Sequence, residues 1–487
     1  MEEPTRILFL AAEADPFVKV GGLGDVAGSL PCALASLPSA QDGTDQGIEI
    51  RLVLPYHHSV CRDIHPIIRQ GEFVIPTRQG DTPVEVHASR MDGVAVYFLR
   101  GPWLPPNGPV YSMNASLDME KFGVFSIASL FLTREWGWAP DILHVNDWHT
   151  ALAAYALPAL RRSLPTLRRT RSVLTLHNLP FMGADCGKLL ARFGMGPSRA
   201  PALPKWGRRF PLPLGLLKSD RIVAVSPSYA HEILTPEFGC SLEEFLQTRQ
   251  ESIQGILNGL DSQRWNPSSD SHLSANFDLD HLQVRRENTC ALRRETGLDD
   301  DPRIPLLAII SRMDHQKGID LALNGIRRLK NTPFQLVILG TGNPDLEDDC
   351  QRLADEFPAA VRYLRRFDMP LSHRIYAGAD MLLMSSRYEP CGLAQMIAMR
   401  YGCVPVAREI GGLKDTIVSS GASQTGILFS AGTPEGAAQA IKDAIRIFHR
   451  PDAWKRIQRA GMQRDFSWGI SARQYAQLYR CLKEGQQ

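Results

Sequence analysis

Short apolar runs rich in β-branched residues alternate with amphipathic segments along most of this chain, and this alternation limits the possible folds more than any other feature. Such runs are typical of buried parallel strands joined by right-handed helical crossovers. The sequence therefore predicts an α/β protein. In the first half the runs are RILFLAA (6–12), IEIRLVLP (48–55), VAVYFLR (94–100), DILHV (141–145), SVLTLH (172–177) and RIVAV (221–225). In the second half they are PLLAIISR (305–312), FQLVILGTG (334–342), VRYLRR (361–366), DMLLMSS (380–386), CVPVAR (403–408) and TGILFS (425–430).

The two series of strands indicate two domains, since a chain of 487 residues is too long for one hydrophobic core. Between them lies a polar stretch, residues 266–283, which we interpret as the linker or its margin. We expect two Rossmann-like domains facing an interdomain cleft, with C-terminal helices returning to the first domain. The predicted boundaries are 1–262, 263–465 and 466–487.

Charge and cysteine content exclude several classes of protein. The formal net charge is +2, so no broad field favours nucleic acid or a membrane, and we interpret the basic run Arg161–Arg171 as a solvated helix end. The nine cysteines include no CxxC pair, which favours reduced thiols. The acidic N-terminus is unlike a signal peptide, and no apolar run approaches the ~18 residues of a membrane span. We expect a soluble, cytoplasmic protein.

The first predicted strand ends at Glu13 and is followed by a lysine and glycines before a helix. Lys19 precedes Gly21 and Gly22, and Asp25 follows. The glycines allow positive φ angles and close approach of a ligand, while a helix N-terminus favours an anion. An anion or sugar site and a structural tight turn both remain open. The pattern matches neither GxGxxG nor the Walker motif.

Polar residues also follow later strands of the first half. The segment Asn146-Asp147-Trp148-His149 follows one strand, His177-Asn178 the next, and Asn258 a further one. Asn146 or Asp147 as a helix N-cap is an alternative, although it leaves the tryptophan unexplained. Because ligands bind outside the carboxyl ends of strands in open α/β sheets, we expect these side chains to serve one site.

In the second half, Arg312 ends a strand and Lys317 stands near the next helix start, which predicts a diphosphate clamp. Glu389 precedes a Pro-Cys-Gly turn; Cys391 has no evident neighbouring base, so we interpret it as buried packing. The carboxylates are dispersed and share no metal-ligand spacing. We therefore predict a site without a metal.

The ordered set KVGGLGDV, HVNDWHT, HNL, ILNGLD, SRMDHQKG, RYEPCGL and GGLKDT resembles bacterial glycogen synthases and plant starch synthases. The resemblance runs from about residue 6 to about residue 480. It implies the GT-B fold and transfer of glucose from ADP-glucose to the non-reducing end of an α-1,4-glucan. It also implies retention of configuration, a nucleotide sugar as donor substrate, and neither cofactor nor metal.

The resemblance also implies roles for individual residues. The expected catalytic residues are Lys19, Asp147, His177, Arg312, Lys317 and Glu389. The expected substrate-binding residues are Glu13, Gly21, Gly22, Asp25, Tyr111, Trp148, Asn178, Asn258, Phe367, Cys391, Gly392 and Leu393. Among them, Phe367 would stack on the adenine, and Tyr111 and Trp148 would contact the acceptor sugar.

The chain departs from the family pattern at Val20, Asn146, Arg366 and Ala394, which leaves donor preference and rate open. One rival interpretation is another retaining GT-B glucosyltransferase that uses UDP-glucose. Many such enzymes have a second glutamate eight residues after the first, where this chain has Ile397. A second rival, a weakly active glucan-binding homologue, would have no need of the cationic clamp.

Overall fold

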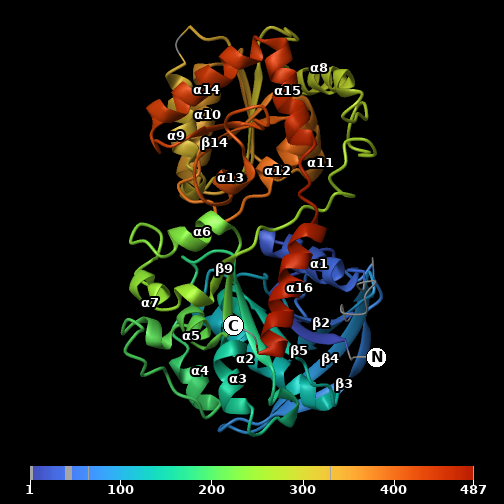
Figure 1. Cartoon of the computed structure of the whole chain (residues 1–487), viewed down its shortest axis with the longest axis vertical. Helices are drawn as coiled ribbons and strands as arrows, with labels where there is room; N and C mark the ends of the chain where they lie inside the picture. The colour runs from blue at the N-terminus through green and yellow to red at the C-terminus, as the bar shows by residue number, and fades with distance from the viewer. Residues whose placement is uncertain (1–3, 39–46, 64, 330, 486–487) are drawn as a thin grey trace. The chain divides into compact units, whose positions relative to one another are not determined.

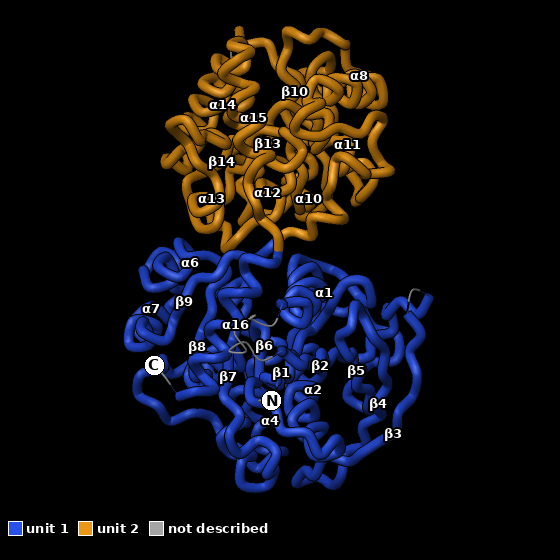
Figure 2. Tube along the Cα trace, turned by 45° about the vertical axis from the view of Figure 1, so that its right-hand side comes forward, with its two compact units in different colours: residues 1–259, 468–487 blue, residues 260–467 orange. Residues whose placement is uncertain are grey.

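The computed structural model describes residues 4–38, 47–63, 65–329 and 331–485. The chain divides into two compact units (Figure 2). Unit 1 comprises residues 1–259 and 468–487, and unit 2 comprises residues 260–467. The domain boundaries inferred from the sequence, at residues 262 and 465, stay a prediction.

Unit 1 contains a nine-stranded sheet in the order β3-β4-β5-β2-β1-β6-β7-β8-β9. All six strands predicted for this half are present and pair in parallel. They are β1 (Thr5–Leu10), β2 (Ile48–Pro55), β5 (Val94–Arg100), β6 (Ile142–Asn146), β7 (Arg171–Leu176) and β8 (Arg221–Ala224). The short β9 (Ile253–Gly255) extends the sheet beside β8 in parallel.

Sequence patterns missed two strands at the other edge, β3 (Ile68–Ile75) and β4 (Thr82–Met91). They pair antiparallel with each other, and β4 pairs antiparallel with β5. β3 exposes much of its length, and its register shifts between Arg69 and Gly71. Strands with one solvated face lack the continuous apolar run that marks a buried parallel strand.

Helices surround this sheet (Figure 1). Those of unit 1 are α1 (Gly22–Ala35), α2 (Ala115–Glu135), α3 (Asp147–Leu160), α4 (Gly187–Arg192), α5 (Pro211–Lys218), α6 (Pro227–Glu232), α7 (Glu243–Gln247) and α16 (Trp468–Glu484). α2 is buried along most of its length and packs against α3. Short 3-10 turns in this unit are Pro165–Leu167, Gly207–Arg209 and Gln250–Ser252.

The C-terminal helix α16 packs against α1 and against the strands of unit 1, so the predicted return of the chain to the first domain is confirmed. The hydroxyl of Tyr479 lies 2.5 Å from His144 Nδ1 on β6, and that of Tyr475 lies 3.3 Å from Thr175 Oγ1 on β7. Ser471 donates to the carbonyl of Leu257 at 2.6 Å.

Unit 2 contains a six-stranded parallel sheet in the order β12-β11-β10-β13-β14-β15. These are the strands predicted for the second half, so the α/β, GT-B fold class is confirmed. They are β10 (Leu306–Ile310), β11 (Gln335–Leu339), β12 (Val361–Leu364), β13 (Met381–Met384), β14 (Val404–Arg408) and β15 (Ile427–Phe429). The helices are α8 (Arg285–Thr296), α9 (Ile319–Arg327), α10 (Pro344–Glu356), α11 (Met369–Gly378), α12 (Ala394–Arg400), α13 (Gly411–Thr416), α14 (Pro434–Phe448) and α15 (Pro451–Met462), with 3-10 turns at Leu282–Val284 and His315–Lys317.

The polar stretch 266–283, predicted to be the linker or its margin, packs onto unit 2. The buried Asp270 accepts hydrogen bonds from His373 Nδ1 and from the Tyr401 hydroxyl, both at 2.6 Å. The Trp265 ring stacks on His373 with 4.0 Å between centroids. The stretch is therefore an integral part of unit 2 rather than a free linker.

None of the helices in the described part of the chain has both the length and the apolar composition needed to cross a membrane.

Candidate active site

The end of β1 brings three of the predicted site residues together around Glu13. This carboxylate is buried, and it accepts hydrogen bonds from the N–H groups of Val20 and Gly21 and from the Tyr111 hydroxyl at 2.9 Å. Burial raises the pKa of Glu13, and the backbone donors oppose that shift. Glu13 thus fixes the loop that carries Lys19 and positions Tyr111 beside it.

Lys19 is held by two carboxylates near it in the sequence, Asp15 before it and Asp25 in the first turn of α1. Its Nζ lies 2.5 Å from Asp25 Oδ1 and 3.6 Å from Asp15 Oδ2. The following helix, α1, has no side-chain cap at its N-terminus. The loop therefore presents an ammonium group and a helix N-terminus near each other, which suits an anionic ligand.

Gly21 and Gly22 do not use the positive φ angles that glycine allows. Gly21 has φ −137°, and Gly22 is absent from the positive-φ glycines of the described chain. A Cβ on Gly22 would meet nothing within 4 Å, whereas a Cβ on Gly28 would lie 2.2 Å from the Asp15 carbonyl oxygen. Packing thus requires Gly28 but not Gly22. The open space at the exposed Gly22 leaves room for a ligand to approach the backbone.

Asp147 begins α3 directly after β6 and has a left-handed backbone, with φ +51°. It is buried, and its Oδ1 accepts hydrogen bonds from the N–H groups of His177 at 2.7 Å and Asn178 at 3.3 Å. Burial raises the pKa of Asp147 to about 7. The carboxylate therefore joins the ends of β6 and β7 instead of capping its own helix. Strained backbone of this kind is concentrated at functional sites.

Asn146 is the N-cap residue of α3, but its side chain makes no capping hydrogen bond. Its Nδ2 donates to the Leu10 carbonyl at 2.9 Å, and its Oδ1 lies 2.9 Å from His177 Nε2. Because Oδ1 can only accept, His177 carries its proton on Nε2 and leaves Nδ1 as an acceptor. Burial lowers the pKa of His177 to about 3, so the ring is neutral.

An aromatic cluster surrounds His149, which the sequence analysis did not assign a role. Its ring lies 4.4 Å from Trp148, 5.1 Å from Tyr111 and 4.8 Å from Phe122 between centroids. Its Nδ1 is buried without a partner among the described residues. The signal was available, since His149 belongs to the same segment as Asp147 and Trp148.

A buried ion pair orders the chain before Tyr111, and it too was missed. Lys121 Nζ lies 2.7 Å from Asp118 Oδ1 and donates to the Val110 carbonyl at 2.6 Å. The spacing of Asp118 and Lys121, three residues apart on α2, was its only sequence signal.

The two predicted asparagines carry unsatisfied acceptors. The Oδ1 atoms of Asn178 and Asn258 are both buried without a hydrogen-bond partner in the described chain. Buried polar atoms are normally paired, so these oxygens suit a ligand or water. Asn258 follows β9 and forms no hydrogen bond with the other predicted site residues of unit 1 that the structure describes.

In unit 2, the loop after β10 and the end of β13 meet through one ion pair. Lys317 Nζ donates to both carboxylate oxygens of Glu389, at 2.8 and 2.7 Å, and the Ser386 hydroxyl donates to the second at 2.9 Å. Glu389 is buried. Arg312 is exposed, and its guanidinium forms no ion pair with a described residue. The structure thus brings Lys317 to Glu389 and leaves Arg312 available to an anion.

The turn after Glu389 is held tightly. Gly392 has φ +75°, and the Gln395 amide donates to the carbonyls of Cys391 and Gly392 at 3.0 and 2.9 Å. The N–H of Gly412 donates to the Glu389 carbonyl at 3.0 Å, and a Cβ there would lie 2.1 Å from the Cys391 carbonyl oxygen. Cys391 is buried, as expected, and Leu393 is the N-cap residue of α12.

Phe367 follows β12 and is 83% exposed, so its ring is accessible for stacking. Arg366 beside it forms an ion pair with Asp368 at 2.9 Å. Within the described residues no group of three or more His, Cys, Asp or Glu side chains is arranged to hold a metal ion. That the site works without a metal remains a prediction.

Residues 6–248 match the family model "Starch synthase catalytic domain", and residues 304–446 match "Glycosyl transferases group 1". Glycogen synthase 1 of Methylococcus capsulatus is 36% identical over 98% of this chain and 96% of its own length. The glycogen synthase of Aromatoleum aromaticum is 38% identical over 98% and 97%.

Solved structures agree with these relatives. The catalytic domain of starch synthase IV from Arabidopsis thaliana, bound to ADP and acarbose, superposes with a TM-score of 0.87 at 30% identity, covering 99% of this chain and 100% of that one. A sucrose-phosphate synthase from Thermosynechococcus elongatus has a TM-score of 0.61 at 17% identity, covering 99% and 100%, which shows a shared fold alone.

Proposed function

The chain belongs to the glycogen and starch synthase family of glycosyltransferases, and from this premise we propose that it transfers glucose from ADP-glucose to the non-reducing end of an α-1,4-glucan. The transfer retains the anomeric configuration. The observation that carries the proposal is the ion pair between Lys317 and the buried Glu389, together with the unpaired Arg312 on the same loop as Lys317. These groups supply the cations and the carboxylate that a nucleotide-sugar transferase needs.

The donor is a substrate rather than a cofactor. Arg312 and Lys317 bind its diphosphate and stabilise the negative charge that develops as the bond to glucose breaks. Phe367 stacks on the base. The ADP in the related starch synthase IV structure supports an adenine nucleotide. UDP-glucose is the alternative donor, because Phe367 offers a face to either base.

Glu389 and the backbone of Cys391, Gly392 and Leu393 hold the donor sugar hydroxyls. In unit 1, the neutral His177 offers Nδ1 and Asn258 offers Oδ1 to hydroxyl groups. The departing phosphate removes the proton from the acceptor hydroxyl, so no carboxylate nucleophile is required.

The acceptor glucan contacts Tyr111, Trp148 and the reacting centre near Asp147. The Lys19 loop, with Gly21, Gly22 and Asp25, contacts the donor phosphates and sugar, and Glu13 holds that loop in place. The nine free cysteines support a reducing compartment such as the cytoplasm.

A radiolabel assay tests the proposal. The purified chain is incubated with a glycogen primer and either radiolabelled ADP-glucose or radiolabelled UDP-glucose, and incorporation of label into glycogen is measured. We expect incorporation from ADP-glucose into product that an exo-amylase specific for α-1,4 bonds degrades. Incorporation from UDP-glucose but not from ADP-glucose would show that UDP-glucose is the donor. If neither donor gives incorporation while the chain still binds glycogen, the proposed transferase activity is refuted.

A matched pair of arginine variants sharpens this assay. Arg312→Gln should reduce turnover about 100-fold, since it removes one charge-assisted contact to the leaving group. Arg328→Gln, an exposed arginine of unit 2 paired with Glu435, should leave turnover unchanged. Equal effects of the two would contradict the role of Arg312.

A further inference from the structure

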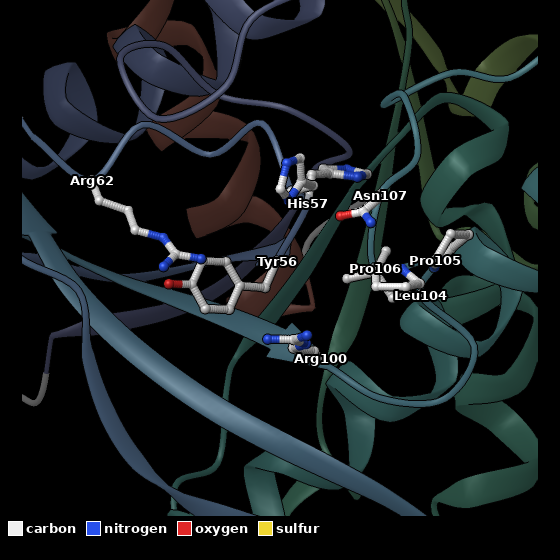
Figure 3. A pocket seen from close by; sticks show the side chains of 9 residues that line it. Tyr56, His57, Arg62, Arg100, Leu104, Pro105, Pro106 and Asn107 are labelled. Carbon is white, nitrogen blue, oxygen red and sulfur yellow. The ribbon is translucent and has the colours of Figure 1, made fainter.

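Unit 1 contains a pocket with a volume of ≈ 180 Å³ at the carboxyl ends of β2 and β5. These strands are parallel neighbours in the sheet. One wall consists of Tyr56, His57, His58 and Arg62, which follow β2. The other includes Arg100 and Asn107, at and after the end of β5. Figure 3 shows Tyr56 with Arg62 on one side and Asn107 with Pro105 and Pro106 on the other.

The pocket is cationic, and its charges are unbalanced. Neither Arg62 nor Arg100 forms an ion pair with any described residue, and no carboxylate lines the pocket. Glu85 lies opposite Arg100 in the β4–β5 register, but its carboxylate is 3.3 Å from His87 Nε2. Two guanidinium groups without a counterion at one concave surface attract an anion.

The remaining lining groups suit a small oxyanion better than a sugar. The Arg62 guanidinium lies over the Tyr56 ring at 5.2 Å from its centroid, so the aromatic face that a glucose ring would stack on is covered. Asn107 also lines the pocket and adds a neutral amide donor. The arrangement supplies two cations and one neutral donor.

We propose that this pocket binds the phosphate group of a small ligand, with Arg62 and Arg100 as its cationic contacts and Asn107 as a neutral donor. The ligand is either inorganic phosphate or a sugar carrying one phosphate, since both present the same group. The pocket is distinct from the proposed donor contacts, which belong to unit 2 and to the Lys19 loop.

Hydrogen bonds connect the pocket to the Glu13–Lys19 segment. His57 Nε2 donates to the Ala12 carbonyl at 3.0 Å, and the N–H of Cys61 donates to the Phe17 carbonyl at 2.7 Å. The opposite wall leads along the chain to Tyr111, which donates to Glu13. A ligand that orders the pocket therefore also restrains residues 12–19.

Hydrogen–deuterium exchange of the full chain tests the proposal. Inorganic phosphate is added in increasing concentration, with chloride at the same ionic strength as the control. Exchange is measured in the segments of residues 12–19, 56–62 and 100–107. We expect saturable slowing in all three segments. In a second arm, tighter binding of a hexose monophosphate would identify a phosphorylated sugar as the ligand, and equal or weaker binding would identify free phosphate.

Two double variants with the same change in charge provide the control. Arg62→Gln/Arg100→Gln should raise the phosphate concentration that gives half-maximal slowing about tenfold or more, since hydrogen bonds to charged groups are the strong ones. Arg168→Gln/Arg169→Gln removes two exposed arginines outside the pocket and should change nothing. All four side chains are exposed, so the fold is retained.

Three results would overturn the proposal. One is slowing confined to 311–318, the segment of the proposed donor contacts. Another is equal weakening by both double variants, which means nonspecific attraction. The third is slowing of the pocket segments by an unphosphorylated maltooligosaccharide but not by phosphate, which would make the pocket a glucan site.

Discussion

The first strand–helix junction of each unit carries a lysine, but the two lysines are held differently. Lys19, between β1 and α1, pairs with Asp25 in the first turn of α1, six residues along the chain. Lys317, between β10 and α9, pairs with Glu389, which follows β13 and lies 72 residues along the chain. The unit 2 pair is thus fixed by two separate junctions of the sheet, whereas the unit 1 pair is local. Long-range pairing positions a charge more rigidly than a contact within one loop.

The groups that bind the buried carboxylates of the candidate site also differ between the two units. In unit 1, Glu13 and Asp147 are bound by N–H and O–H groups, and burial raises the pKa of both. In unit 2, Glu389 is bound by Lys317. Each unit has an exception: Asp118 of unit 1 pairs with Lys121 at 2.7 Å, and burial raises the pKa of Asp380 of unit 2 although Arg285 is 3.8 Å away. The stability of unit 1 should therefore depend on protonation of its buried groups. The site in unit 2 should instead depend on the Lys317 cation.

Acidification should give the largest change in stability, and it should destabilise unit 1 more than unit 2. Burial lowers the pKa of His57 to about 4 and those of His144 and His149 to about 3. Such a histidine binds its proton only after unfolding, so its contribution is full above about pH 6.5 and is lost as the pH falls towards 4. At pH 5 the loss is roughly 2 kcal/mol per histidine.

The raised pKa of Asp147 opposes this loss over the same range, because a carboxylate that protonates in the folded state stabilises it as the pH falls. Glu13, whose pKa burial also raises, acts in the same direction as Asp147. Because the pKa of His177 is likewise lowered to about 3, four histidines of unit 1 outweigh these two carboxyl groups. Hydrogen exchange at pH 7 and pH 5, corrected for intrinsic rates, should show loss of protection in β6 and α3 before β10 and β11. Earlier loss in unit 2 would contradict the comparison.

Lys317→Ala should give the next largest effect. It removes a cation that stabilises the leaving diphosphate, so turnover with ADP-glucose should fall about 1000-fold, while glucan affinity changes little. It also leaves Glu389 buried without its partner. Because the Lys317 side chain is 22% exposed, we expect a loss of only about 1–3 kcal/mol in urea unfolding.

The double variant Lys317→Ala/Glu389→Gln separates catalysis from stability. It removes the unpaired charge, so the free energy of unfolding should recover, but turnover should stay low. Recovery of turnover together with stability would mean that Lys317 serves the fold alone.

Asp147→Asn tests the carboxylates of unit 1. At pH 8 the folded state holds an ionised Asp147 at a cost, so the variant should be more stable by up to about 4 kcal/mol. Near pH 4 the difference should vanish, since Asp147 is protonated there. Urea unfolding at both pH values measures this. The exposed Asp92, which also has positive φ (+45°), provides the control Asp92→Asn, which should show no such pH dependence.

A glycine pair should give the smallest changes in stability. Gly28→Ala places a Cβ 2.2 Å from the Asp15 carbonyl and should destabilise unit 1 by about 1–3 kcal/mol. Gly22→Ala meets no atom within 4 Å, so its unfolding free energy should change by less than about 0.5 kcal/mol. If a ligand occupies that space, Gly22→Ala should lower turnover. Unchanged turnover would remove Gly22 from the proposed donor contacts.

The sequence predicted the parallel strands well because each is a continuous apolar run. It missed β3 and β4, whose partly solvated faces break that pattern. It also interpreted residues 266–283 as the linker or its margin, since the contacts that bind Asp270 come from His373 and Tyr401, far along the chain. Local patterns carry no signal of such long-range polar contacts.

At the candidate site, the sequence identified most of the side chains that the structure groups, because strand ends could be located. It did not foresee that Asp147 binds backbone N–H groups after β7, or that Glu13 binds the N–H of Gly21. Both arrangements depend on hydrogen bonds between separate strands. The catalytic and binding roles assigned to these residues stay predictions.

Helix α16 has a consequence for synthesis on the ribosome. The segment that buries the rings of Tyr475 and Tyr479 beside His144 is translated after all of unit 2. Until it emerges, the nascent unit 1 leaves part of β6 and β7 uncovered. The half of the protein that begins first is therefore completed last, and during that interval its apolar surface is available to chaperones or to premature association.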